Sequence, residues 1–188
     1  WEREVAANWK TVIDNNHECY HCAVNHKALM ELIDYDTKAA WSDDGITFIH
    51  AVERKNLDNA AYQLRPADLE QEAMFGFVFP TTIPLMFPGT SSLAVFQVIP
   101  TGPETTRERW DFHFASRTPG EPEQKLMDYI RNTLVPEDVG LCEAVQRGLR
   151  SRGYRQGRFV VDREHCEYSE HHVHFFQRMV HDAMMALR

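Results

Sequence analysis

The sequence has few cysteines, no long apolar run and fewer basic than acidic side chains. Its 20 Lys and Arg residues stand against 28 Asp and Glu residues, so the formal net charge is −8. This balance argues against nucleic acid or an anionic membrane as a partner. The longest apolar runs, such as residues 93–96, fall far short of the roughly 18 residues of a membrane span, and no secretory leader is evident.

The four cysteines, at positions 19, 22, 142 and 166, belong to a chain large enough to fold without disulfides. We therefore expect reduced thiols and a cytoplasmic protein. Cys19 and Cys22 form one C-x-x-C pair, but no second pair follows at the spacing of a zinc site. Cys19-Tyr20-His21 also matches half of a C-x-H…C-x-x-H iron–sulfur pattern. Because neither Cys142 nor Cys166 has a histidine three residues on, we expect no iron–sulfur cluster within this chain.

Apolar periodicity predicts helices towards both ends of the chain and strands between them. The helical segments are 2–22, 29–33, 122–133, 136–150 and 168–187. Period-two alternation predicts strands over 46–53, 75–79, 92–99 and 107–115. The first should form a hairpin with residues 38–42, and the last two should pair antiparallel. Runs of strands flanked by helices favour an α+β fold, with an antiparallel sheet packed against helices.

One carboxylate and two imidazoles lie close together in the segment Glu18–His26. His21 and His26 are five residues apart, about 140° around an ideal helix, so they converge only if the helix ends or bulges between them. A helix end near Asn25 would achieve this. Two histidines and one carboxylate on one face are the ligands typical of a catalytic iron(II) that keeps positions open for dioxygen.

The third ligand must come from elsewhere in the chain, and Asp138 is the strongest candidate. It shares one side of a predicted helix with three apolar residues, Leu141, Cys142 and Val145. A carboxylate that faces a core needs a cation or several hydrogen-bond donors. Glu137 is the nearest competitor, but its angle favours a solvated charge in the first turn of the helix.

Other patterns have simpler structural interpretations. In the histidine cluster 171, 172 and 174, only His172 lies near the apolar stripe of the C-terminal helix, so we expect a polar face. His50 and His113 are expected to be satisfied strand residues. The methionines 179, 184 and 185 predict ordinary helix packing. The aromatic set is expected to be mostly core: Tyr20, Phe48, Phe75, Phe77, Trp110, Phe112 and Phe114.

Two segments resemble the catalytic domain in the large subunit of Rieske non-heme iron oxygenases. The first comprises Asn8-Trp9-Lys10, Asp14-Asn15 and Glu18 to His26, and the second comprises Glu137 to Glu143 with Val145 to Leu149. The resemblance spans nearly the whole chain. It implies a helix-grip fold, in which an antiparallel sheet wraps around a long C-terminal helix. It also implies that residues 1–188 are the mononuclear iron domain and that the Rieske domain precedes Trp1.

The resemblance further implies His21, His26 and Asp138 as iron ligands. Glu18 would be a bridging acid that relays electrons or coupled protons from a Rieske [2Fe–2S] cluster in the neighbouring subunit of a homotrimer. Dioxygen would be the co-substrate. A separate reductase or ferredoxin component would deliver electrons from NAD(P)H through a flavin.

A Glu followed by Cys-Tyr-His-Cys is similar to the branch that attacks methylated ammonium substrates, which includes carnitine and glycine betaine monooxygenases and stachydrine demethylase. Aromatic faces suit a quaternary ammonium through cation–π attraction. Two alternatives stay open. One is an aromatic-ring hydroxylating dioxygenase. The other is a non-enzymatic carrier of hydrophobic ligands, because helix-grip folds also serve as lipid or hormone binders.

Overall fold

A seven-stranded antiparallel sheet forms the centre of the computed structural model, which describes residues 1–34, 47–54, 56–66, 72–161, 163 and 169–187. The strand order is β1-β7-β6-β5-β4-β3-β2. The strands are β1 (Glu2–Val5), β2 (Ile33–Asp34), β3 (Thr47–Arg54), β4 (Ala73–Val78), β5 (Thr82–Met86), β6 (Ser92–Gly102) and β7 (Thr105–Phe114). The predicted antiparallel pairing of β6 with β7 is confirmed, with Phe96 opposite Trp110. The predicted hairpin partner at 38–42 lies outside the described residues.

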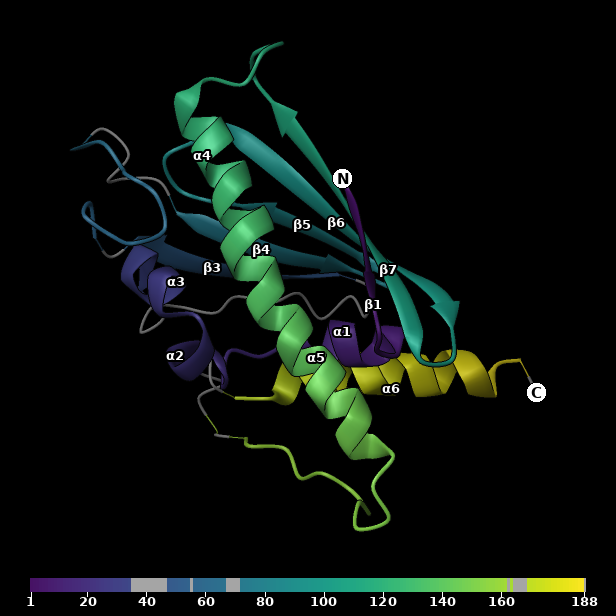
Figure 1. The fold of residues 1–188 in the computed structure, drawn as a ribbon. Helices are drawn as coiled ribbons and strands as arrows, with labels where there is room; N and C mark the ends of the chain where they lie inside the picture. Colours follow the sequence, from purple (N-terminus) through teal and green to yellow (C-terminus); the bar gives the residue numbers. More distant parts are fainter. Residues whose placement is uncertain (35–46, 55, 67–71, 162, 164–168, 188) are drawn as a thin grey trace.

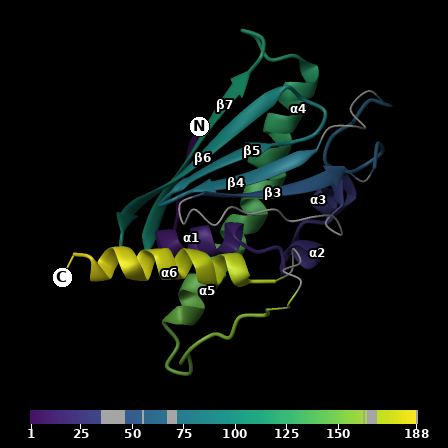
Figure 2. The same cartoon turned by 180° about the vertical axis from the view of Figure 1, so that it is seen from behind.

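The helices surround this sheet unevenly. They are α1 (Trp9–Asn16), α2 (Cys22–Asn25), α3 (Lys27–Leu32), α4 (Glu121–Tyr129), α5 (Val135–Leu149) and α6 (His171–Met185). One long helix made of α4 and α5 crosses a face of the sheet, whereas α1 and α6 lie beside each other at one end of it (Figure 1). Figure 2 shows the same long helix behind the strands. The α+β class with an antiparallel sheet is confirmed, and none of the described helices is long and apolar enough to cross a bilayer.

The long helix joins two segments that the sequence predicts as separate helices. A π-helical turn over Ile130–Leu134 connects α4 to α5. At its end the backbone N–H of Val135 donates to the carbonyl of Ile130, five residues back. The next residue, Pro136, has no N–H to donate, and the wider π turn lets the helix continue through it. The predicted helix over 136–150 is therefore present as α5, but the prediction that it is separate from the preceding helix is wrong.

The chain begins with a strand, so the predicted helix over 2–22 is wrong over residues 2–8, and it is wrong again over 17–21, which lie between α1 and α2. Residues 2–5 pair with β7 at the edge of the sheet, where Val5 is buried. The side chain of Asn8 then caps α1 by accepting a hydrogen bond from the backbone N–H of Lys10. An Asn at this position stops the helix from extending backwards.

Strand β5 was not predicted, because Pro84 lies at its centre and proline cannot donate to a sheet ladder. The strand forms because the neighbouring residue in β4 is Gly76. A Cβ atom on Gly76 would lie only 2.9 Å from Cγ of Pro84. The missing side chain leaves the space that the proline ring needs.

The core links α6 to the sheet through Phe176, whose side chain is fully buried. Its ring lies 5.7 Å from Phe77 of β4 and 5.8 Å from Trp9 of α1. The far half of α6 is different, because Met184 and Met185 are 62% and 50% exposed, so their predicted packing is wrong. Tyr20, predicted as core, is also exposed at the surface. The C-terminal half of α6 therefore extends beyond the hydrophobic core.

Candidate metal centre

The end of α2 brings the two histidines of the segment 18–26 together. His21 is the residue before α2, and His26 is the residue after it, with φ −110° and ψ 63°. The backbone leaves the helical conformation at His26, which turns its ring back towards His21. The predicted helix end near Asn25 is confirmed. A regular helix through His26 would instead have separated the two rings by about 140°.

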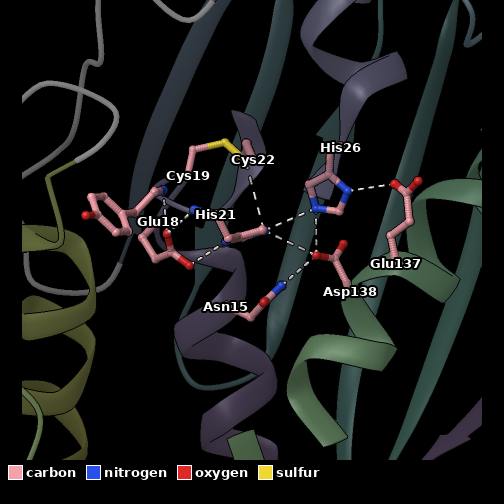
Figure 3. Close-up of a disulfide and its surroundings, with 9 residues drawn as sticks. Asn15, Glu18, Cys19, His21, Cys22, His26, Glu137 and Asp138 are labelled. Atoms are coloured by element: carbon pink, nitrogen blue, oxygen red, sulfur yellow. Dashed lines mark hydrogen bonds and ion pairs between the residues drawn. A yellow bond between two sulfur atoms is a disulfide. The ribbon is translucent and has the colours of Figure 1, made fainter. Parts of the chain in front are cut away.

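Three donor atoms converge at this point, although they come from distant parts of the chain (Figure 3). Nε2 of His26 lies 2.9 Å from Oδ1 of Asp138 and 3.1 Å from Nε2 of His21. The third separation, from Nε2 of His21 to Oδ1 of Asp138, is 3.4 Å. Metal bonds of about 2.1 Å at right angles would place neighbouring donors about 3 Å apart. The spacing therefore fits a facial metal site.

Each of these three side chains is held by a further partner (Figure 3). Nδ1 of His21 lies 2.5 Å from Oε1 of Glu18, and Nδ1 of His26 lies 2.8 Å from Oε2 of Glu137. Asn15 donates from Nδ2 to Oδ1 of Asp138 over 2.8 Å. A carboxylate on Nδ1 fixes the tautomer that leaves Nε2 free for a metal. Glu137 thus contacts His26 and is not the solvated charge that the sequence predicted.

The carboxylates also set the protonation of the imidazoles. Burial alone lowers the pKa of His21, but hydrogen bonds to Asp138 and Glu18 outweigh burial and raise this pKa to about 9. The pKa of His26 is raised in the same sense, by Asp138 and Glu137 against the effect of burial. Burial raises the pKa of Asp138, yet its hydrogen bonds from both imidazoles lower it to about 2. A metal ion bound here must displace protons from the imidazoles.

Cys19 and Cys22 form a disulfide beside these histidines, which corrects the expectation of reduced thiols. The turn before α2 places their Cα atoms 4.9 Å apart, within the range that a disulfide requires. Sγ of Cys22 lies 4.0 Å from Nε2 of His21. Because that sulfur is bonded to Cys19, it offers no thiolate to a metal. Cys142 is a buried free thiol, and Cys166 lies outside the described residues.

A cavity of about 120 Å³ opens onto the three donor atoms. Its wall is mainly apolar and aromatic: Phe75, Leu85, Phe87, Phe96, Trp110 and Leu134. Phe75 and Trp110, both expected in the core, therefore also border this space. His172 lines the same cavity and is buried, as its predicted place near the apolar stripe requires. His174 and His113 are exposed.

The sequence analysis missed one acid in the cavity wall, Glu108. It lies on β7 two residues before Trp110, and both side chains are buried. The alternation of Trp110, Phe112 and Phe114 predicts this strand, and extending it backwards by one period places Glu108 on the inward face. Such an extension of the pattern could have found the residue.

Comparison with known families identifies the family of this chain. Residues 1–186 match the family described as the ring hydroxylating alpha subunit, catalytic domain. The chain belongs to this family of Rieske-type oxygenases. The family resemblance inferred from the motifs is thus confirmed, and the matched family is one of catalytic domains.

Curated relatives come from bacteria and plants. The chain is 33% identical over 178 residues to the carnitine monooxygenase oxygenase subunit of Acinetobacter baumannii, covering 94% of the chain and 47% of that protein. It is 27% identical to the chloroplastic choline monooxygenase of Amaranthus tricolor, covering 92% of the chain and 37% of that protein. The oxygenase domain therefore spans about half, or less, of the length of these relatives.

Solved structures agree with the sequence relatives. The quaternary ammonium Rieske monooxygenase CntA, in complex with its substrate L-carnitine, superposes with a TM-score of 0.82 at 30% identity, covering 97% of this chain and 47% of that one. Naphthalene 1,2-dioxygenase from a Rhodococcus species superposes with a TM-score of 0.67 at 15% identity, covering 99% and 55%. The second likeness is one of fold alone.

Proposed function

We propose that this chain is the catalytic domain of an oxygenase that hydroxylates a small quaternary ammonium compound at a mononuclear iron(II). The convergence of His21 Nε2, His26 Nε2 and Asp138 Oδ1 in the lining of the cavity carries this proposal. The names of the relatives, which are carnitine and choline monooxygenases, support the substrate class.

His21, His26 and Asp138 would hold the metal, and iron(II) bound there would supply the redox chemistry that activates dioxygen. The protein contributes the rest. Glu18 and Glu137 orient the two imidazoles through Nδ1, and Asn15 orients the carboxylate. The apolar wall keeps bulk water from the reacting centre.

The contacts of Glu18 support a role as the bridging acid. One of its oxygens contacts Nδ1 of His21, and the other accepts the backbone N–H groups of Tyr20 and His21. Electrons would reach the domain from a Rieske [2Fe–2S] cluster of a neighbouring subunit in a homotrimer, after transfer from NAD(P)H through a flavin reductase or ferredoxin. The solved structure of a related quaternary ammonium Rieske monooxygenase is described as giving insight into inter-subunit electron transfer. We place the assembled protein in the cytoplasm.

The reaction inserts one oxygen atom into a C–H bond next to the substrate nitrogen. The second oxygen atom leaves as water, with two electrons and two protons consumed. Hydroxylation of an N-methyl group gives a carbinolamine, which collapses to formaldehyde and the demethylated amine.

Iron analysis tests the metal site in the full-length oxygenase that contains this chain. After anaerobic reconstitution, wild type should hold one iron per chain beyond the iron of its cluster, which visible absorption quantifies. His21→Ala and Asp138→Ala should each lose that iron, whereas His113→Ala, a change at an exposed histidine of β7, should retain it. Retention of iron in both site variants would refute the ligand assignment.

Product analysis tests the substrate class. With its reductase, the full-length oxygenase should turn over carnitine, choline or glycine betaine with coupled consumption of dioxygen. Naphthalene and benzoate should give no hydroxylated ring. Turnover of arenes without turnover of betaines would refute the proposed substrate class and favour an aromatic-ring hydroxylating dioxygenase.

A further inference from the structure

Glu108 occupies an unusual place in the wall of the cavity. The inward positions of β7 are Thr106, Glu108 and Trp110, which are 0%, 3% and 4% exposed. Trp110 stacks on Phe96 of the neighbouring strand at 4.4 Å and on Trp1, the residue before β1, at 5.8 Å. These stacked rings fix the strand, so the Glu108 carboxyl is held in a rigid and largely apolar wall.

The Glu108 carboxyl is not compensated in the way that the other acids of the cavity are. Glu18 contacts His21, and Asp138 contacts both imidazoles. By contrast, Oε2 of Glu108 is buried without a hydrogen-bond partner among the described residues. Among the described residues, Glu108 forms no ion pair either. A buried carboxyl oxygen without a partner is costly, and such groups concentrate at functional sites.

The surroundings of Glu108 disfavour its ionised form. Burial is the main cause and raises its pKa to about 8. The Trp110 indole and the Arg3 guanidinium oppose this, but they do not cancel it. A cation that enters the cavity would stabilise the ionised carboxylate, which nothing among the described side chains does fully.

We propose that Glu108 is the specificity-determining residue for the cationic head of the substrate, whose positive charge its carboxylate balances inside the cavity. The inference rests on the proposed function and deepens it. A quaternary ammonium has no N–H to donate, so it is held by opposite charge and by aromatic faces. Phe75, Phe87 and Phe96 supply aromatic surface in the same wall. A neutral ligand of the same shape would gain the apolar contacts and leave Glu108 uncompensated.

A matched ligand pair tests this role in the iron-loaded, full-length oxygenase under anaerobic conditions. Choline and 3,3-dimethylbutan-1-ol have the same shape and differ in the charge of the head group. We expect wild type to bind choline more tightly, as measured by calorimetry. Glu108→Gln should reduce the preference for choline about tenfold or more, because loss of one partner of a buried charge pair costs at least that much, while binding of the alcohol stays equal or improves. Glu108→Asp should retain most of the preference.

Two controls separate this role from a structural one. Glu4→Gln removes an exposed acid from the adjacent strand β1 and should leave the preference unchanged. Because an amide is cheaper to bury than a carboxylate, Glu108→Gln should keep its iron and unfold at the same temperature as wild type or higher. If wild type prefers choline and Glu108→Gln keeps that preference, the role of Glu108 is refuted while the proposed function stands. If wild type shows no preference, the proposed substrate class fails as well.

Discussion

Oδ1 of Asp138 lies 2.9 Å from Nε2 of His26, although 112 residues separate the two along the chain. The first residue lies in the first turn of α5, and the second follows α2. Their contact depends on the packing of the long helix across the sheet. The metal centre is therefore a product of the tertiary fold, and changes in its supporting residues should be measurable.

Glu137→Gln should weaken iron binding without abolishing it. The change removes the charge that orients His26 through Nδ1, and loss of such an outer partner typically lowers metal affinity about 10- to 100-fold. Competition with a calibrated chelator measures the affinity. Glu143→Gln, further along the same helix where the side chain accepts the N–H of Ala6, serves as the reference and should bind iron like wild type. Equal iron affinity in the two variants would show that Glu137 is a solvated charge that does not support the metal site.

Glu18→Gln should retain iron and lose turnover in the assembled oxygenase. The amide oxygen can still accept from Nδ1 of His21, so iron is retained with at most the loss of affinity expected of Glu137→Gln, but the group can no longer carry a proton with the electron. We expect the rate to fall by at least about a hundredfold, within the range of a positioned acid–base group. Stopped-flow reduction and iron analysis of the same preparation distinguish a variant that retains iron but turns over slowly from one that has lost its iron. Loss of iron would make Glu18 a ligand instead.

His17 should make the fold sensitive to acid. Burial lowers its pKa to about 3, from a usual 6.5, against the hydrogen bond to the carbonyl of Ile13. Below pH 6.5 the unfolded chain gains a proton at His17 that the folded chain does not. Its stabilisation is therefore complete above pH 6.5 and is lost progressively as the pH falls towards 3. Between pH 7 and pH 5 the loss is about 2 kcal/mol.

Urea unfolding at several pH values measures this slope. In His17→Gln it should be shallower than in wild type, and His113→Gln should match wild type. Asp14, whose pKa burial raises to about 7 despite its hydrogen bond from Gln177, contributes with the opposite sign in all three proteins, so it cancels in the comparison. Parallel curves for His17→Gln and wild type would rule out His17 as the sensitive group.

Phe176→Ala should destabilise the fold strongly. The ring is fully buried and contacts α1 and β4, and truncation of a buried Phe costs about 3–5 kcal/mol. Met184→Ala, on the exposed half of the same helix, should change the free energy of unfolding by less than about 0.5 kcal/mol. Denaturation midpoints of the two variants give the contrast. A large loss in Met184→Ala would show that this half of α6 is covered in the protein.

Local chemistry made parts of this molecule predictable and left others hidden. The break between His21 and His26 follows from helix geometry, and the inward position of Asp138 follows from its neighbour Cys142, which is buried. Val145 belongs to the same apolar stripe, yet it is half exposed. A helix that crosses a sheet buries its stripe only where it touches the strands.

Long-range pairing explains the elements that the sequence did not reveal. Strand β1 exists because β7 offers it an edge, and β5 tolerates Pro84 because Gly76 lies beside it. The contact of Glu137 with His26 joins residues 111 apart. Periodicity in one segment carries no information about such partners, so it could not separate a solvated acid from one that orients a ligand.

The π turn at Ile130–Leu134 amounts to one extra residue inserted into an α-helix. Each residue of a helix advances the next side chain by about 100°. Removing one residue from this turn would straighten the helix and rotate everything beyond it, so that Asp138 would point away from both histidines. The geometry of the metal centre therefore depends on the number of residues in a segment that contributes no donor atom to it.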